Sequence, residues 1–400
     1  MKKYKLGDIC EIVSGSTPKT NITEFWDGDV KWITPAELDE NTYIITDSVR
    51  KITNLAMQKT GLTAFPAGTV ILSSRAPIGK VAIAGCKMCC NQGFKNFICS
   101  EIVNNKYLYW FLKHNTAYLN SLGRGATFKE ISKSIVSSIE IDLPSLEEQK
   151  RVVDNIEKIS TIITLRKKEI SILDDLIKAR FVEMFGLVRN NVYGYKIKML
   201  QDVCEPIKDG THQTPTYVND AQHGFKFLSS KDVTSGKINW SKIKYIPSDL
   251  HEELYAKIKP KRGDILLAKN GTTGVAAVVE TDEIFDIYVS LALLRPIDMN
   301  SIYLWAAVNS ADTKHQFDSS LKGIGVPNLH LGDIKKTKII VPPLELQSQF
   351  ADFVIQVDKS KLLSGCRLFH SWAPENRDQP KHVGVPQRKT KVLRGGRRQQ

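Results

Sequence analysis

The chain has 400 residues, 42% of them hydrophobic and 25% charged, which is typical of a soluble globular protein of two or three domains. Its formal net charge of +13 favours a polyanionic partner, of which nucleic acid is the commonest. No run of about 18 apolar residues occurs and the first residues lack the apolar core of a signal peptide, so we expect no membrane span, no secretion and a cytoplasmic location.

The sequence contains two related segments, repeated with a period of roughly 195 to 200 residues. A Leu-Gly-Asp-Ile-Cys opening at residues 6–10 corresponds to Leu-Gln-Asp-Val-Cys at residues 200–204. Lys31-Trp32-Ile33 corresponds to Lys226-Phe227-Leu228 in the same order. Repeats in a fixed order indicate a duplicated structural unit.

A strand, a polar turn and a second strand are predicted in the middle of each segment, because apolar runs are bounded there by glycine, proline and polar residues. The first segment has its strands at residues 65–72 and 81–84, with the turn at 74–79. The second segment has its strands at residues 261–267 and 275–279, with the turn at 269–274.

Both segments also end alike. A short aromatic helix is predicted at residues 107–113 and 303–308, and a strand that ends in proline follows in each segment before a Leu-Glu-x-Gln sequence. We therefore predict an α+β protein with two homologous mixed α/β domains, residues 1–145 and 190–343.

A long helix is predicted between the two domains, in residues 146–189, of which residues 147–185 would form a rod about 58 Å long. Its apolar residues recur in steps of four and three, which is typical of a coiled-coil seam, and Arg166 and Arg180 occupy two seam positions. The alternative is an amphipathic helix packed on its own domain. The apolar seam residues are Val152, Ile156, Ile159, Ile163, Ile170, Leu173, Ile177 and Met184.

A second, shorter helix is predicted at residues 344–361, with Phe350, Val354 and Val357 in the same phase. The shared seam phase favours a coiled coil, and the second helix is expected to be truncated near Lys361. A partner of that length covers two or three turns of the first helix. The seam residues expected to lie uncovered are Ile170, Leu173, Ile177 and Met184.

The last segment, residues 362–400, differs in composition from the rest of the chain. Residues 364–400 hold nine basic and two acidic residues, with three prolines and no apolar periodicity. A Ser-Gly pair at residues 364–365 disfavours continuation of the helix. We expect this segment to be a disordered basic tail.

Motifs for enzymatic chemistry are missing. The sequence has no phosphate-binding loop, no complete dinucleotide fingerprint, no Asn-Pro-Pro-Tyr run and no His-Glu-x-x-His pair, so we predict no catalytic residue. Cys86 and Cys89, near Cys90 and Cys99, have a spacing seen in zinc sites. A second pair at finger-like spacing is missing, so buried reduced thiols and no metal are the favoured interpretation.

The order of domain, helix, domain and helix resembles the specificity subunit of type I restriction-modification systems, over about residues 4–361. The resemblance rests on the opening at residues 4–9, the strand and turn at 68–79, and the exit Leu-Pro-Ser-Leu-Glu-Glu-Gln at 143–149, which recurs as Val-Pro-Pro-Leu-Glu-Leu-Gln at 341–347. It implies a non-catalytic DNA-binding subunit. Each domain would read one half of a bipartite target, and the helices would form an antiparallel coiled coil that sets the distance between the halves.

The resemblance also implies partners and cofactors. Methyltransferase subunits would dock on the chain and use S-adenosylmethionine, and restriction subunits would use ATP with Mg. The chain itself would bind double-stranded DNA and no cofactor. The short distal helix departs from the family pattern.

Candidate DNA contacts cluster in and near the polar turns. Arginine and lysine suit guanine edges and asparagine suits adenine, so Arg75 in the first turn is matched with Lys269 and Asn270 in the second. A core position is favoured for Trp32 and Phe227 over base stacking. The candidates are Lys31, Trp32, Arg75, Lys80, Arg124 and Lys129 in the first domain, and Lys226, Lys231, Lys269, Asn270, Thr272 and Lys322 in the second.

The alternative function is a coiled-coil adaptor whose basic tail binds nucleic acid nonspecifically. A nonspecific binder shows steep salt dependence and little preference between sequences, which separates it from a reader of defined sites. A lone methyltransferase is disfavoured by the missing motifs.

Overall fold

The structure is a computed structural model that falls into two compact units, Met1–Leu165 and Arg166–Gln400. We describe each unit by itself. The backbone is described for residues 2–39, 41–75, 77–125, 129–219, 224–233, 236–271, 273–321 and 327–370, and side chains as far as residue 362.

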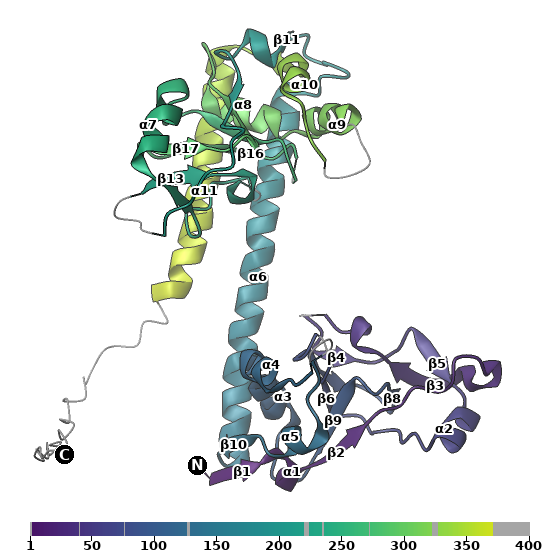
Figure 1. The fold of residues 1–400 in the computed structure, drawn as a ribbon. Helices are drawn as coiled ribbons and strands as arrows, with labels where there is room; N and C mark the ends of the chain where they lie inside the picture. The colour runs from purple at the N-terminus through teal and green to yellow at the C-terminus, as the bar shows by residue number, and fades with distance from the viewer. Residues whose placement is uncertain are drawn as a thin grey trace, which may run out of the picture. The chain divides into compact units, whose positions relative to one another are not determined.

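The first unit is built on a five-stranded sheet (Figure 1). Its strands β6 (Val70–Ser73) and β7 (Val81–Ala84) are buried along their whole length, because their continuous apolar runs have covered neighbours on both faces. All neighbours pair antiparallel except the edge strand β4, which pairs parallel with β7. The strand order is β2 (Cys10–Ser14), β9 (Phe94–Cys99), β6, β7, β4 (Ile44–Ile45).

Two smaller sheets complete the first unit. In the three-stranded sheet, β3 (Trp26–Ile33) lies between β5 (Arg50–Ile52), antiparallel, and β8 (Cys89–Cys90), parallel. In the two-stranded sheet, β1 (Lys2–Lys5) pairs antiparallel with β10 (Glu140–Leu143). This pairing brings the start of the unit to the point where its last helix begins.

The second unit repeats these sheets. Its four-stranded order β12–β18–β15–β16 corresponds to β2–β9–β6–β7, and its three-stranded order β14–β13–β17 corresponds to β5–β3–β8, including the parallel pairing of the last strand. The predicted α+β fold of two homologous domains is confirmed. The bounds are β11 (Lys196–Met199), β12 (Lys208–Asp209), β13 (Phe225–Leu228), β14 (Lys244–Ile246), β15 (Ile265–Ala268), β16 (Ala276–Val278), β17 (Phe285–Ile287), β18 (Leu291–Leu294) and β19 (Lys338–Val341), which pairs with β11.

Short helices flank the sheets in both units. The predicted aromatic helices are α3 (Asn105–His114) and α8 (Ser301–Val308), and each starts directly after an asparagine cap that accepts two backbone N–H bonds, Asn104 and Asn300. The others are α1 (Leu6–Ile9), α2 (Asn54–Thr60), α4 (Thr116–Leu122), α5 (Lys133–Ser137), α7 (Ser248–Lys257), α9 (Ala311–Ser320) and α10 (Leu331–Lys336).

The repeated Leu-Glu-x-Gln sequence fastens each long helix to its domain. The Gln149 amide accepts from Asn104 N (2.8 Å) and donates to Ile102 O (3.0 Å) and Pro144 O (2.9 Å). Gln347 repeats this arrangement, accepting from Asn300 N (3.0 Å) and donating to a proline carbonyl. Both glutamines are fully buried, so their hydrogen bonds hold the helix start in one orientation.

The two long helices are α6 (Leu146–Phe185) and α11 (Leu344–His370). The prediction that the second helix stops near Lys361 is wrong, because α11 continues to His370. A glycine inside a helix costs only about 1 kcal/mol, which an established helix tolerates. Beyond residue 370, the rest of the expected basic tail lies outside the described residues.

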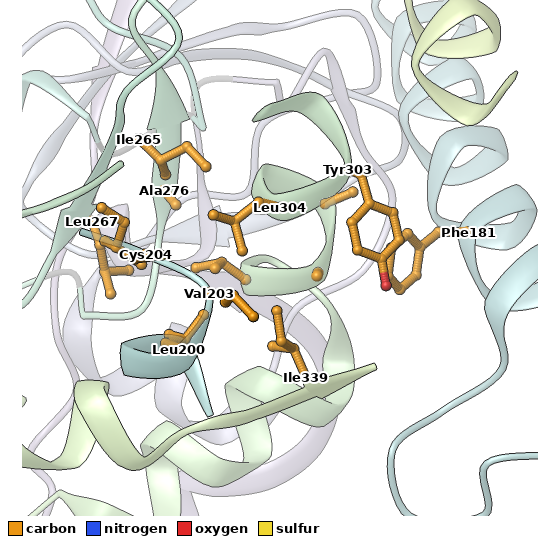
Figure 2. Packing of buried hydrophobic residues seen from close by; sticks show 14 of the residues in the cluster. Phe181, Leu200, Val203, Cys204, Ile265, Leu267, Ala276, Tyr303, Leu304 and Ile339 are labelled. Atoms are coloured by element: carbon orange, nitrogen blue, oxygen red, sulfur yellow. The ribbon is translucent and has the colours of Figure 1, made fainter. Parts of the chain in front are cut away.

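In the second unit, α11 packs antiparallel against the last turns of α6 (Figure 1). The Phe350 ring contacts the rings of Phe181 and Phe185, with centroids 5.5 and 5.6 Å apart, and further along Lys361 Nζ lies 2.6 Å from Asp174 Oδ1. Phe181 also stacks on Tyr303 in the domain core, 5.6 Å between centroids (Figure 2). The helix pair is therefore part of the core of this unit.

This pairing corrects the expected coverage of the seam. Ile177 is buried, and Leu173 and Met184 pack against the core, although all three were expected to lie uncovered. The start of α11 adjoins the domain that follows α6, so it meets the end of α6 first. The seam residues that are exposed lie earlier in α6, and they are Ile159, Ile163 and Ile170, at 45%, 41% and 37% exposure.

A series of ion pairs connects α6, α11 and Lys237 in the second unit. Lys361 Nζ binds both Asp174 and Asp358, and Asp358 also receives Lys237 Nζ at 3.3 Å. Burial raises the pKa of Asp358, but the hydrogen bond from Lys361 and the charges of Lys237 and Lys361 outweigh burial and hold that pKa below its ordinary value. In the described ranges, no helix is both long and apolar enough to cross a membrane.

Candidate nucleic-acid interface

The turn after β6, which we call the first polar turn (residues 74–79), is held against a returning segment at residues 130–131. Ser74 N donates to Gly93 O (2.8 Å), and Ile131 N donates to Ser74 O (2.9 Å). The next residues along, Arg75 and Glu130, form an antiparallel bridge. This bridge lies where the turn leaves the sheet, so it places Arg75 at the sheet's end.

The second polar turn (residues 269–274) has the same backbone frame. Lys269 N donates to Ser290 O (2.9 Å), Leu329 N donates to Lys269 O (2.8 Å), and Asn270 bridges Asn328. Arg75 therefore corresponds to Asn270 alone, and Lys269 corresponds to Ser74. The expected match between Arg75 and Lys269 was wrong by one residue.

The electrostatics of the first polar turn depend on Glu130. Arg75 Nε donates to Glu130 Oε2 at 2.9 Å, and the buried Lys95 Nζ lies 3.5 Å from Glu130 Oε1. Lys95 Nζ also donates to Ser74 Oγ at 3.3 Å. The Arg75 side chain is 44% exposed, while that of Lys95 is 7% exposed. One carboxylate therefore joins an interior charge to a surface charge.

A cavity of about 360 Å³ opens beside this turn. Arg75 lines it, and so does Lys80, whose Nζ donates to Pro35 O (3.0 Å) and Leu38 O (2.5 Å). The remaining lining residues are Thr34, Pro35, Ala36, Pro77, Asn91 and Gly93. Two cations and several backbone groups at one opening suit a polyanion.

The second polar turn has different side chains on its matching frame. Lys269 is buried, and its Nζ lies 2.5 Å from Asp209 Oδ2. The side-chain oxygens of Asn270 and Asn328 are buried and have no hydrogen-bond partner in the described part of the chain. Buried amide oxygens without partners are rare in folded proteins, so both oxygens retain the capacity to accept a hydrogen bond.

Two of the candidate DNA contacts are interior residues. Trp32 is 2% exposed, donates from Nε1 to Ser16 O (3.0 Å) and packs edge-on against Trp26. Lys269 is enclosed with Asp209 as described above. Neither side chain reaches the surface, so both assignments are corrected, and Phe227 is likewise in the core.

The other candidates divide into engaged and open side chains. Lys31 donates to Thr46 O (2.6 Å), Lys80 is held by two carbonyls, and Lys226 pairs with Glu283. Thr272 and Lys322 lie outside the described residues. The exposed candidates are Arg124, Lys129 and Lys231, with Arg75 half-exposed and Asn270 partly buried.

Sequence reasoning missed the residues that support the turns: Lys95, Glu130, Asp209 and Asn328. A usable signal existed for Lys95, since a lysine inside the apolar strand Phe94–Cys99 requires an anionic partner. The identity of that partner carried no local signal, because Glu130 is 35 residues further along the chain.

The cysteines once considered for zinc lie in or beside the sheets. Burial raises the pKa of Cys89 to about 11 and that of Cys90 to about 12, so both remain neutral thiols at neutral pH. Among the described residues, no group of three or more His, Cys, Asp and Glu side chains is placed to hold a metal ion.

The structure thus contains two copies of one α/β unit, each with a polar turn on the same backbone frame but with different side chains. The protein-family model described as the type I restriction modification DNA specificity domain matches residues 1–173 and 194–365, so the chain belongs to that family. It is the non-catalytic DNA specificity subunit of a type I restriction-modification system.

The chain is similar to curated members of this family. It is 31% identical to the type I restriction enzyme MjaIX specificity subunit of Methanocaldococcus jannaschii over 386 residues, covering 88% of this chain and 85% of that protein. It is 22% identical to the MjaVIII specificity subunit of the same organism, with the same two coverages.

Solved structures share the fold. The specificity subunit of M. genitalium matches with a TM-score of 0.50 and 13% identity, covering 92% of each chain. A chain from a structural study of complex assembly in the type I restriction-modification system matches with a TM-score of 0.58 and 19% identity, covering 92% of this chain and 93% of that one.

Proposed function

We propose that the chain reads a bipartite DNA target, with residues 1–145 reading one half and residues 190–343 the other, each through its polar turn. The observation that carries the proposal is the shared backbone frame of the two turns with unlike side chains, Arg75 in one and Asn270 in the other. An arginine fork suits guanine and an asparagine amide suits adenine in the major groove. A duplicated frame with different readers recognises two different half-sites.

Exposed basic side chains near the two polar turns also support DNA binding at these places. Arg124 and Lys129 flank the segment that returns to Glu130, and Lys231 is exposed near the second polar turn, where Ser230 N donates to Ser290 Oγ (2.9 Å). Charges of this kind bind phosphates and orient the duplex without reading its sequence. We assign them to the DNA backbone and assign Arg75 and Asn270 to base edges.

The proposal extends to partners. The chain assembles with methyltransferase subunits, which bind S-adenosylmethionine, and with restriction subunits, which use ATP and Mg, in the cytoplasm. The exposed apolar residues of α6, such as Ile159 and Ile163, support this assembly, because a helix in a finished complex rarely leaves such residues in water. Co-purification of the full chain with a methyltransferase subunit from the same host is the direct test.

A domain exchange tests the reading of two half-sites. Residues 1–145 are replaced by the matching domain of a relative, the chain is co-expressed with its methyltransferase subunit, and methylated adenines are mapped across the host genome. One half of the methylated motif should change while the other half and the spacing stay the same. A change in both halves, or in neither, refutes the proposal.

A further inference from the structure

Lys95 is an interior charge in the first unit. It lies in β9 opposite Leu72 of β6 on one side and Ser14 of β2 on the other, and 6% of its surface is exposed. A buried ammonium group is costly unless it is paired and hydrogen-bonded. Its partners among the described residues are Ser74 Oγ at 3.3 Å and Glu130 Oε1 at 3.5 Å.

Glu130 uses its two carboxylate oxygens for two different cations. Oε1 faces Lys95 in the interior, and Oε2 accepts from Arg75 Nε at the surface. A carboxylate held at both oxygens cannot rotate, so it fixes the plane of the guanidinium that it binds. Because the contact to Arg75 is made through Nε, the two Nη groups remain for another partner, and none engages them in the described part of the chain.

The second unit shows which part of this arrangement is required by burial alone. It also contains a buried lysine and a carboxylate, but Lys269 stands in the turn itself and binds Asp209, while Ala292 occupies the strand position of Lys95. Among the described residues, Asp209 forms no hydrogen bond with the Asn270 side chain. A buried lysine can therefore be paired by a carboxylate that does not contact the residue in the turn. Among the described residues, only the carboxylate of the first unit, Glu130, contacts both the buried lysine and the turn residue Arg75.

We propose that Lys95 and Glu130 are positioning residues for sequence reading: Lys95 fixes Glu130, and Glu130 holds the Arg75 guanidinium so that its Nη groups contact a guanine in one half-site. This inference rests on the proposed role of the first polar turn. The two free Nη donors match the two acceptors, O6 and N7, that guanine presents in the major groove. A freely rotating arginine discriminates less because it also reaches phosphates and other bases.

The test uses the full chain in complex with its methyltransferase subunit and a library of random-sequence duplexes, from which bound molecules are sequenced. Four variants are compared with the natural chain: Arg75→Lys, Glu130→Gln, Lys95→Met, and the double variant Lys95→Met/Glu130→Gln. The melting temperature of each is recorded alongside. Asp209→Asn serves as the matched control, since it breaks the other buried lysine pair without touching Arg75.

We expect Arg75→Lys and Glu130→Gln to relax the preference for guanine at the same single position of the same half-site, by roughly ten-fold. The double variant separates positioning from stability. It removes the unpaired interior charge and so recovers melting temperature relative to Glu130→Gln, yet the guanine preference stays relaxed. Asp209→Asn should lower the melting temperature and leave the first half-site unchanged.

The inference is overturned if the double variant regains the guanine preference together with its stability, because Glu130 is then only structural. It is also overturned if Glu130→Gln relaxes a different position from Arg75→Lys, or weakens all sequences equally. The domain exchange distinguishes this failure from failure of the proposed function, because the exchange can still move one half of the motif when Arg75 and Glu130 have no effect.

Discussion

Replacing Phe350 with alanine should unfold the second unit at a markedly lower temperature. Phe350 is fully buried between α6 and α11, and its ring contacts Phe181 and Phe185 edge-on. Removing a buried phenylalanine side chain costs about 3–5 kcal/mol, which includes the cavity left behind. The lost aromatic contacts place the expected cost in the upper part of that range.

A loss of about 4–5 kcal/mol corresponds to a fall in melting temperature of about 8–20 °C for a unit of this size. Urea unfolding of the full chain, followed by circular dichroism and fitted with one transition for each unit, measures the loss in free energy of unfolding. Leu362→Ala on the same helix is the matched control, because Leu362 is 67% exposed and its loss should change stability by less than about 0.5 kcal/mol. If Phe350→Ala costs no more than this control, the antiparallel pairing of α6 with α11 is wrong.

Three further predictions concern the turns and the ion pairs of Asp358. Asn270→Ala should reduce the base preference at one position of the second half-site by about 1–3 kcal/mol and leave the first half-site unchanged. Competition binding with base-substituted duplexes measures this preference. An equal loss of affinity for every sequence would assign Asn270 to a phosphate contact. The pKa of Asp358 is lowered in the folded chain, so its contribution to stability is complete above the ordinary aspartate pKa and is lost as pH falls through the lowered value. The free energy of unfolding of Asp358→Asn should therefore depend less on pH than that of the natural chain below about pH 4. The same pH dependence in both proteins would contradict this prediction. Gly79→Ala should destabilise the first unit more than Gly271→Ala destabilises the second. Both glycines have positive φ, but of the two only Gly79 would place a Cβ 2.5 Å from a side-chain carbon, that of Thr116. Equal falls in melting temperature for the two substitutions would rule out this clash.

Local patterns were enough to predict the two central strands of each unit and the polar turn between them. The apolar runs that became β6 and β15 are bounded by glycine and polar residues in the sequence, and the duplicated order confirmed that they belong to equivalent units. An apolar run bounded by turn residues does not depend on distant residues, so such strands can be found before the fold is known.

Contacts between distant residues could not be predicted in this way. Glu130 meets Arg75 because the returning segment is added to the end of the sheet, a pairing across 55 residues that no periodicity indicates. The heptad seam predicted a helix pair, but it carried no information on which turns of α6 the second helix meets. That register follows from the aromatic contacts of Phe350, and Phe181 and Phe185 were outside the predicted seam.

The two buried lysines meet the same electrostatic need from different places in the duplicated fold. Lys95 stands in a strand and pairs with Glu130, whereas Lys269 stands in the polar turn and pairs with Asp209. The two positions adjoin in the first unit, since Lys95 Nζ donates to Ser74 Oγ and Ser74 corresponds to Lys269. A column-by-column alignment of the two units therefore counts these lysines as unrelated, although each supplies one interior ammonium group to the same region of the fold.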